Sequence, residues 1–240
     1  MINYLVVIPA RLGSKRLPNK PLLNIKGIPM IIRTFNQCKK VVPLNKIIIA
    51  TDSKKIVDVC KKYNAPVTLT SKHCLTGTDR VVEVAKKIKS KIYVNLQGDE
   101  PVFPEKDLKL FISKAIKNKK ILLNGYCDIK NFEDFKSLSI PKVVIDEKEN
   151  LLYMSRSAIP GNKKNRFIKA WRQVCVYSFP REILLKITKN NKKSKLENIE
   201  DIEILRFIEK GMSVKMIKLS NKSLAVDTKK DLKKVLKLIN

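Results

Sequence analysis

The sequence contains very little histidine and no closely spaced cysteines of the kind that bind metals. It has one histidine, His73, and its five cysteines are odd in number and form no CxxC pair. Histidine-rich metal centres and histidine-based triads are therefore excluded, and the cysteines indicate free thiols in a reducing compartment. His73 precedes Cys74, but neighbouring residues of an extended chain point to opposite faces, so they do not suggest a nucleophile and its base.

Long apolar runs are missing as well. No run approaches the roughly 18 residues that a membrane-spanning helix needs. The first residues, Met1-Ile2-Asn3, lack the basic segment that opens a signal peptide. We therefore expect a cytoplasmic protein with no membrane span.

Acidic residues are scarce: 22 Asp and Glu stand against 51 Lys and Arg, which gives a net charge of +29. Such a charge favours nucleic acid or an anionic membrane as a partner. However, aromatic residues, on which single-stranded nucleic acids stack, make up only 6% of the chain. The cations are mostly lysines spread over nearly every predicted helix. We interpret them as a diffusely basic surface and expect no specific nucleic-acid partner; a polyanion-binding surface is the alternative.

Short β-branched segments alternate with longer amphipathic ones, which predicts an α/β fold with a mostly parallel sheet and helices on both faces. Continuous apolar runs such as Ile47-Ile48-Ile49 are typical of strands buried on both faces. The predicted strands span 4–9, 46–50, 66–69, 91–96 and 121–126, and the predicted helices span 29–40, 54–63, 79–88 and 105–117.

The alternation stops after about residue 130. A predicted β-hairpin at 141–155 and an extended segment at 171–179 come before a helix at 197–210, a strand at 213–217 and a helix at 228–238. We expect one domain over 1–240, with an α/β core from 1–140 and 196–240 and an insertion at 141–195.

Three polar segments lie at predicted strand ends or before a helix. Pro9–Lys20 carries four cations and no acid, Asn95–Pro101 carries Asp99, and Ala225–Thr228 carries Asp227. Ligands of open α/β sheets bind beyond the carboxyl ends of the strands, so these segments should surround one crevice. The residues expected there are Arg11, Lys20, Asp99 and Asp227.

Two carboxylates and several cations suit nucleotidyl transfer. The cations neutralise a triphosphate, and the carboxylates hold Mg²⁺, which activates the α-phosphate. The alternatives are an ordinary turn with solvated cations, a turn residue at Asp99 and a helix cap at Asp227. Neither Gly13 nor Gly27 begins a Walker A motif.

Six motifs carry a resemblance to a known family. The first segment, PARLGSKRLPNKPL, matches the pattern (I/V)PARxxSxR(L/F)PxKPL, and LQGDEP matches QGD(E/Q)P. The others are TGTDR at 76–80, SRSAIP at 155–160, ENIEDIEILR at 197–206 and VDT at 226–228. Together they resemble the sugar-activating cytidylyltransferases, and within them the 3-deoxy-manno-octulosonate cytidylyltransferase (CMP-Kdo synthetase) family.

The resemblance implies a Rossmann-like nucleotide-diphospho-sugar-transferase fold with an inserted β-hairpin subdomain. It implies transfer of CMP from CTP to the anomeric hydroxyl of a 3-deoxy-ulosonic acid, giving pyrophosphate. Kdo, for lipopolysaccharide synthesis, is the expected acid, and an 8-amino analogue or a nonulosonic acid is the alternative. Mg²⁺ as cofactor and a homodimer are also implied.

The resemblance also assigns roles to residues. Asp99 and Asp227 would hold Mg²⁺, and with Arg11 and Lys20 they form the catalytic set. CTP would contact Ala10, Arg11, Ser14, Arg16, Lys20, Gly77, Thr78 and Arg80. The sugar would contact Gln97, Arg156, Gln173, Tyr177, Glu200 and Glu203, with Arg156 pairing with its carboxylate. First-turn acids such as Glu200 and Glu203 can alternatively serve to balance a helix dipole.

One segment departs from the family pattern. Where the family has HLGIYxY, this chain reads QVCVYSF at 173–179. Tyr177 is retained, whereas Gln173 takes the histidine position and Cys175 the glycine position. Glutamine can donate and accept hydrogen bonds but cannot titrate near pH 7, so the exact sugar is left open.

Overall fold

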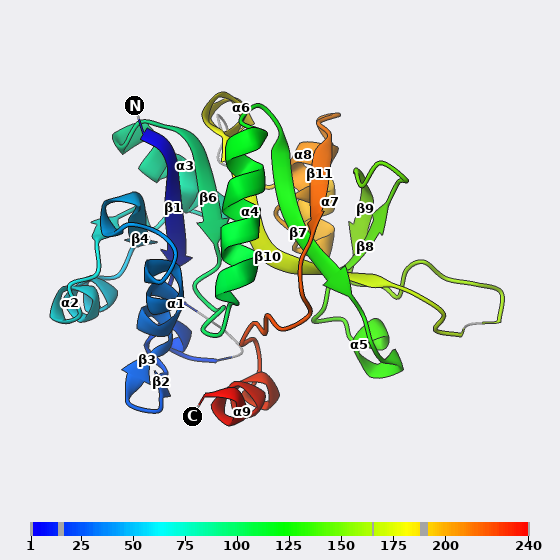
Figure 1. The fold of residues 1–240 in the computed structure, drawn as a ribbon, viewed down its shortest axis with the longest axis horizontal. Helices are drawn as coiled ribbons and strands as arrows, with labels where there is room; N and C mark the ends of the chain where they lie inside the picture. Colours follow the sequence, from blue (N-terminus) through cyan, green and yellow to red (C-terminus); the bar gives the residue numbers. More distant parts are fainter. Residues whose placement is uncertain (1, 14–16, 165, 188–191, 240) are drawn as a thin grey trace.

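The fold is built on one large twisted sheet (Figure 1). The computed structural model describes residues 2–13, 17–164, 166–187 and 192–239. Within them the main sheet has nine strands, seven of which follow the order β11-β7-β10-β6-β1-β4-β5. These are β1 (Ile2–Ala10), β4 (Ile47–Thr51), β5 (Val67–Leu69), β6 (Ser90–Leu96), β7 (Leu122–Asp128), β10 (Trp171–Pro180) and β11 (Val214–Lys218).

Along this seven-strand order most neighbouring strands run parallel, as the alternation predicts. β1 pairs in parallel with β4 and β6, and β11 pairs in parallel with β7. The exception is β10, which runs antiparallel to both β6 and β7. The extended segment predicted at 171–179, within the expected insertion, is therefore a central strand of the core sheet.

Helices cover both faces of the sheet, which explains the nearly continuous apolar strands. One core layer joins the sheet to α1 (Met30–Lys39), α2 (Lys54–Lys62) and α4 (Glu105–Lys117). The opposite layer joins it to α3 (Gly77–Lys87), α6 (Arg181–Ile187) and α8 (Leu205–Ile208). No helix in the described part of the chain is long and apolar enough to cross a bilayer.

The helix predicted at 197–210 is wrong in one respect, because the chain forms two short helices there. α7 (Lys195–Glu200) ends where Asp201 takes a left-handed conformation with φ of 50°, and α8 begins at Leu205. Glu203 lies in the turn between the two helices, and its carboxylate accepts a hydrogen bond from the N–H of Thr78 at the start of α3.

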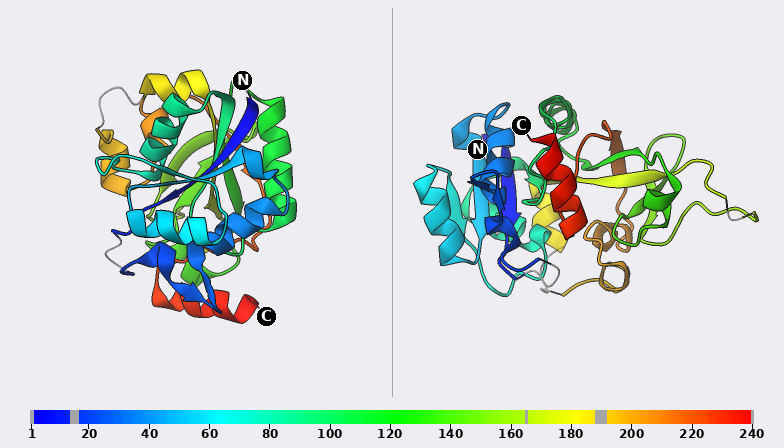
Figure 2. Two further views of the ribbon diagram at one scale, coloured as in Figure 1. Left: turned by 90° about the vertical axis from the view of Figure 1, so that its left-hand side faces the viewer. Right: turned by 90° about the horizontal axis from the view of Figure 1, so that it is seen from below.

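Smaller elements frame the carboxyl edge of the sheet. The hairpin of β8 (Lys142–Ile145) and β9 (Leu151–Ser155) joins the first residues of β10 and confirms the predicted inserted hairpin. The C-terminal helix α9 (Lys229–Leu238) packs against residues of the first loop and of β2–β3 (Figure 2). The remaining short elements are η1 (Lys20–Leu22), β2 (Asn24–Ile25), β3 (Ile28–Pro29), η2 (Leu44–Lys46) and α5 (Phe132–Lys136).

Candidate active site

A cavity of about 1040 Å³ opens at the carboxyl edge of the sheet. Its lining includes the segment after β6, the first half of β10, the chain from 221 to the start of α9, and residues of 128–141, 156 and 201–203. Asp99, Gln97, Arg156, Gln173, Tyr177, Glu203 and Asp227 lie in this lining. The structure thus brings together segments that the strand-end rule places at one crevice.

Lys20 lies between the two aspartates expected to hold a metal. Its Nζ is 2.6 Å from Oδ2 of Asp99 and 2.9 Å from Oδ1 of Asp227. Burial alone would lower the pKa of Lys20, but the charges and hydrogen bonds of the two carboxylates outweigh it and raise that pKa. The first loop, the segment after β6 and the segment before α9 therefore meet at one ammonium group.

The two aspartates fit a magnesium ion. Mg²⁺ usually takes one or two carboxylates and completes its shell with water and substrate phosphates. Oδ1 of Asp99 is buried and has no hydrogen-bond partner among the described residues, so it offers an acceptor to a cation. The backbone N–H of Val226 donates to the carbonyl of Asp99 at 2.9 Å, which fixes the neighbourhood of both carboxylates.

The absence of a side chain at Gly98 permits the position of Asp99 next to the end of β1. A Cβ placed on Gly98 would lie 2.7 Å from the carbonyl oxygen of Pro9, closer than real Cβ atoms approach backbone. The segment after β6 therefore rests directly on the end of β1, and Asp99 follows at once. Thr34 Oγ1 donates to the Gly98 carbonyl at 3.1 Å and fixes it further.

Glu100 and Arg172 line the same cavity and were not among the residues expected there. Glu100 is 2% exposed and accepts a hydrogen bond from Ser223 Oγ. Burial, together with the charge of Asp99, raises its pKa to about 7. Nη2 of Arg172 donates to the Ser223 carbonyl at 2.8 Å. Arg172 could have been found by its type, because arginine is the rarer cation in this chain.

The start of α3 is occupied by a carboxylate. Glu203 accepts hydrogen bonds from the N–H of Gly77 at 3.1 Å, from the N–H of Thr78 at 2.7 Å and from Thr78 Oγ1 at 2.5 Å. Burial raises the pKa of Glu203, and the bonds from Thr78 partly offset this. Gly77 and Thr78 thus face a residue expected on the sugar side, and Glu203 connects the two expected halves of the site.

Arg80 is an internal anchor. Its side chain is 2% exposed, pairs with Asp52 at 2.7 Å and donates to Thr70 Oγ1 at 2.7 Å and to the Ser71 carbonyl at 3.2 Å. It does not belong to the cavity lining, so its effect on a nucleotide would act through the 70–71 segment.

Gln173 and Tyr177 form a short polar chain on β10. Gln173 Nε2 donates to Oδ1 of Asn124 at 2.9 Å and to Oη of Tyr177 at 3.1 Å. Asn124 in turn donates to the carbonyls of Val174 and Val176. Burial raises the pKa of Tyr177 well above its ordinary value, so the phenol stays neutral. Gln97 lies nearby, with Nε2 3.5 Å from Oε1 of Glu203.

Arg156 and Glu200 are tied to each other. The three guanidinium nitrogens of Arg156 donate to the carbonyls of Glu200, Leu138 and Asp201. The Glu200 carboxylate accepts from Ser155 Oγ at 2.6 Å and from the N–H of Arg156 at 2.9 Å. Arg156 lines the cavity, whereas Glu200 does not. Glu200 therefore binds Arg156 from outside the cavity lining and helps to hold it in place.

The first loop is only partly described. Ala10 is buried at the end of β1, and Arg11, next to it, is exposed. The hydrogen bond from Lys193 lowers the pKa of Asp201, and the charges of Arg156 and Arg11 contribute. Arg11 therefore lies near the rim that Asp201 shares with the cavity. Ser14 and Arg16 lie outside the described residues.

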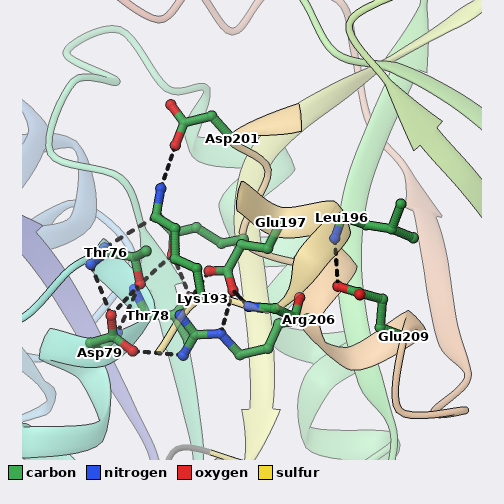
Figure 3. Close-up of polar contacts among 12 residues, drawn as sticks. Thr76, Thr78, Asp79, Lys193, Leu196, Glu197, Asp201, Arg206 and Glu209 are labelled. Atoms are coloured by element: carbon green, nitrogen blue, oxygen red, sulfur yellow. Dashed lines mark hydrogen bonds and ion pairs between the residues drawn. The ribbon is translucent and has the colours of Figure 1, made fainter. Parts of the chain in front are cut away.

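A buried ion cluster holds α3 and α7 together (Figure 3). Arg206 is 3% exposed and makes a bidentate pair with Glu197, both contacts 2.7 Å, and a bond of 2.6 Å to Asp79. Asp79 also caps α3 by accepting from Thr76. The cluster therefore fixes the start of α3, to which Glu203 binds.

Comparison with known proteins identifies the family of the chain. A family model described as Cytidylyltransferase matches residues 5–217. A 3-deoxy-manno-octulosonate cytidylyltransferase of Francisella tularensis subsp. tularensis is 37% identical over 252 residues, covering 100% of both chains. One from Chlorobium phaeobacteroides is 33% identical over 243 residues, covering 99% of this chain and 98% of the relative.

Solved structures show the same similarity. CMP:2-keto-3-deoxy-manno-octonic acid synthetase complexed with CTP superposes with a TM-score of 0.89 at 30% identity, covering 99% of this chain and 98% of that one. A cytidylyltransferase from Leptospira borgpetersenii serovar Hardjo-bovis has a TM-score of 0.63 at 18% identity, covering 98% and 86%. The second likeness concerns the fold alone.

Proposed function

Because the chain belongs to the cytidylyltransferase family, and within it to the 3-deoxy-manno-octulosonate cytidylyltransferases, we propose that it transfers CMP from CTP to Kdo. The anomeric hydroxyl of the sugar attacks the α-phosphate, the bond to the β-phosphate oxygen breaks, and CMP-Kdo and pyrophosphate form. The observation that carries the proposal is the contact of Lys20 with both Asp99 and Asp227, two residues of the cavity lining.

The enzyme's contribution is positioning and charge neutralisation, since the substrate itself supplies the nucleophile. Lys20 and Arg11 bind triphosphate oxygens, with Ser14, Arg16 and Ala10 on the same loop. Asp99 and Asp227 would hold Mg²⁺, which would neutralise charge on the phosphates. Lys20 contacts both carboxylates and so holds them close together before a ligand arrives.

Different groups of residues serve the nucleotide and the acid sugar. Gly77, Thr78 and Arg80 arrange the segment that receives the cytosine end of CTP. Gln97, Gln173, Tyr177 and Glu203 bind sugar hydroxyls, and Glu200 acts by supporting Arg156. The guanidinium of Arg156 retains N–H donors beyond those used for backbone carbonyls, because arginine has five, and these bind the sugar carboxylate.

We further propose a cytoplasmic homodimer that serves lipopolysaccharide synthesis. The free thiols of all five cysteines support a reducing compartment.

Residues 1–140 and 196–240 would form the nucleotide-binding core of a single domain, and 141–195 would serve the sugar and the dimer, although β10 of that segment lies within the core sheet. Leu152 and Ile168 of this segment are 56% and 80% exposed, which supports an interface there. Light scattering should give about twice 27.5 kDa; a fully active monomer would contradict the dimer.

The reaction is tested with pure enzyme, CTP, Mg²⁺ and a panel of acid sugars that contains Kdo, its 8-amino analogue and a nonulosonic acid. We expect pyrophosphate release with Kdo. Release with another acid alone would contradict the Kdo assignment, and no release with any acid would contradict cytidylyl transfer.

A further inference from the structure

Lys142, the first residue of β8, is an unusual buried cation. Its side chain is 0% exposed. The ammonium donates to the carbonyls of Ser137 at 2.8 Å and Ile140 at 2.7 Å, and to that of Arg156. No carboxylate of the described residues forms an ion pair with it. A buried charge without a counter-charge is costly, so the three carbonyls must together make this position tolerable.

All three carbonyls belong to residues that line the cavity. Ser137 and Ile140 come from the chain before β8, and Arg156 directly follows β9. The ammonium therefore ties two separate parts of one wall together. Its backbone is fixed as well, because Lys142 is paired with Ser155 of β9 and Arg172 of β10.

Lys142 fixes Arg156 in two ways. It binds the carbonyl of Arg156 directly, and it holds the 137–140 segment, whose Leu138 carbonyl accepts from Nη1 of Arg156 at 3.0 Å. Glu200 holds the N–H of Arg156 from the other side at 2.9 Å. Losing the ammonium would free one backbone group of Arg156 and loosen one of the three acceptors of its guanidinium.

We propose that Lys142 is a positioning residue for the sugar side of the site, where it fixes Arg156 and the 137–140 wall in the arrangement that receives an acidic sugar. This inference rests on the proposed function, in which Arg156 faces the sugar carboxylate. It predicts a loss of sugar binding without an equal loss of CTP binding.

The protonation of Lys142 provides a second test of its role, because it predicts how sugar binding and stability depend on pH. Burial, together with the charge of Arg156, lowers its pKa to about 8, while Glu200 acts in the opposite direction. A neutral amine has two N–H groups for three carbonyls, so the wall should loosen above this pH. Folding stability should respond in the opposite sense. Between about pH 8 and the ordinary lysine pKa the unfolded chain binds more protons, so the Lys142 contribution to stability rises with pH.

The experiment compares the wild type with Lys142→Met. The variant should raise the KM for Kdo by about 10-fold or more, the size expected for lost hydrogen bonds to a charged group, and leave the KM for CTP within about 2-fold. In the wild type the Kdo KM should rise between about pH 7 and about pH 9.5, and the variant should lack this rise. Leu151→Ala, a core change in neighbouring β9 outside the cavity lining, is the control for lost stability.

Equal effects on both KM values, or effects that match Leu151→Ala, would overturn the proposal. The wild-type pH profile needs no variant, so a flat Kdo KM would overturn it even if Lys142→Met does not fold. Arg156→Lys separates this proposal from the proposed function. A raised Kdo KM in Arg156→Lys but not in Lys142→Met overturns the role of Lys142 alone, whereas an enzyme inactive on every acid sugar overturns the proposed function.

Discussion

Lys20 and Asp99, 79 positions apart, form an ion pair in which Nζ lies 2.6 Å from Oδ2, and the same ammonium contacts Asp227 across 207 positions. The side chains of the three residues are 14%, 24% and 28% exposed, so the cluster is partly desolvated and open to a ligand on one side. Charged groups in such a position interact more strongly than exposed pairs. The cluster is therefore the feature whose removal should affect turnover most.

Asp99→Asn keeps the shape of the side chain and removes its charge. We expect kcat to fall by at least ~10²-fold, as for other preorganised electrostatic groups, and Asp227→Asn to behave similarly. The double variant should be little worse than the poorer single one, because residues acting as one unit are not additive. Steady-state pyrophosphate release measures all three, with Asp58→Asn, at an exposed position of α2, as control.

If Asp227→Asn retained near-normal turnover and magnesium dependence, Asp227 would only precede the helix cap that Thr228 and Asp231 form. The two-carboxylate site would then be wrong. Additive losses in the double variant would also contradict a shared site.

Glu100 should make the ligand-free protein less stable as the pH rises from about 4.5 to about 7. Its pKa is near 7 in the folded chain and 4.5 when unperturbed, so in this window the folded state binds more protons than the unfolded state. The loss amounts to at most about 3 kcal/mol. Urea unfolding in EDTA at several pH values should show this slope in the wild type relative to Glu100→Gln.

Glu147→Gln, at an exposed turn between β8 and β9, is the matched control and should follow the wild type. Identical pH profiles for the wild type and Glu100→Gln would contradict the raised pKa of Glu100.

Gln173→His should introduce a pH dependence that the wild type lacks. The glutamine does not titrate, whereas a histidine at this position would change charge near pH 6.5 in the absence of other influences. We expect kcat/KM for the sugar to gain an additional limb between about pH 6 and 8, while kcat/KM for CTP does not. Gln173→Leu, which leaves Asn124 and Tyr177 without their donor, separates lost hydrogen bonds from the new titration. An unchanged sugar profile in Gln173→His would show that position 173 does not contact the sugar.

Arg206→Met should destabilise the protein by about 3–5 kcal/mol, because it leaves the buried carboxylates of Asp79 and Glu197 without their cation. Chemical denaturation measures the loss. The control is Lys40→Met, which removes a pair with Glu105 that is about half exposed on both sides and should cost at most about 1 kcal/mol. Equal effects of the two changes would contradict a buried cluster that fixes the start of α3.

Local patterns predicted most of the sheet, because strands such as β4 and β6 are apolar runs bounded by turns. They could not place β10, since its antiparallel insertion between β6 and β7 depends on pairing between residues 43 to 88 positions apart in the chain. The strand-end rule brought Asp99 and Asp227 together correctly. It could not show that Lys20 lies between them, because that contact depends on side-chain geometry.

The roles of Glu203 and Lys142 likewise depend on contacts between distant parts of the chain and not on local sequence patterns. The helical pattern continues through residues 197–210, so the break at Asp201 is invisible to periodicity. What the break permits is a contact between Glu203 and Thr78, 125 positions away. Lys142 resembles every other lysine in a lysine-rich sequence, and only its complete burial distinguishes it.

Gly98→Ala provides a test of the backbone beneath the carboxylates. The added Cβ would lie 2.7 Å from the Pro9 carbonyl, so β1 and the segment after β6 would have to move apart. Asp99 follows Gly98 directly, and Lys20 follows β1 across the first loop, so the shift should lengthen their ion pair. We expect kcat to fall by about 10²-fold, since displacements near 1 Å can cost that much.

Stability should fall as well, by about 1–3 kcal/mol, as overpacking costs in a dense region. The matched control is Gly161→Ala, where the nearest atom is 4.0 Å from the added Cβ and no positive φ is required. The outcome that contradicts the argument is a Gly98→Ala enzyme with normal kcat, because the close contact of these two segments would then not determine how Lys20 meets Asp99.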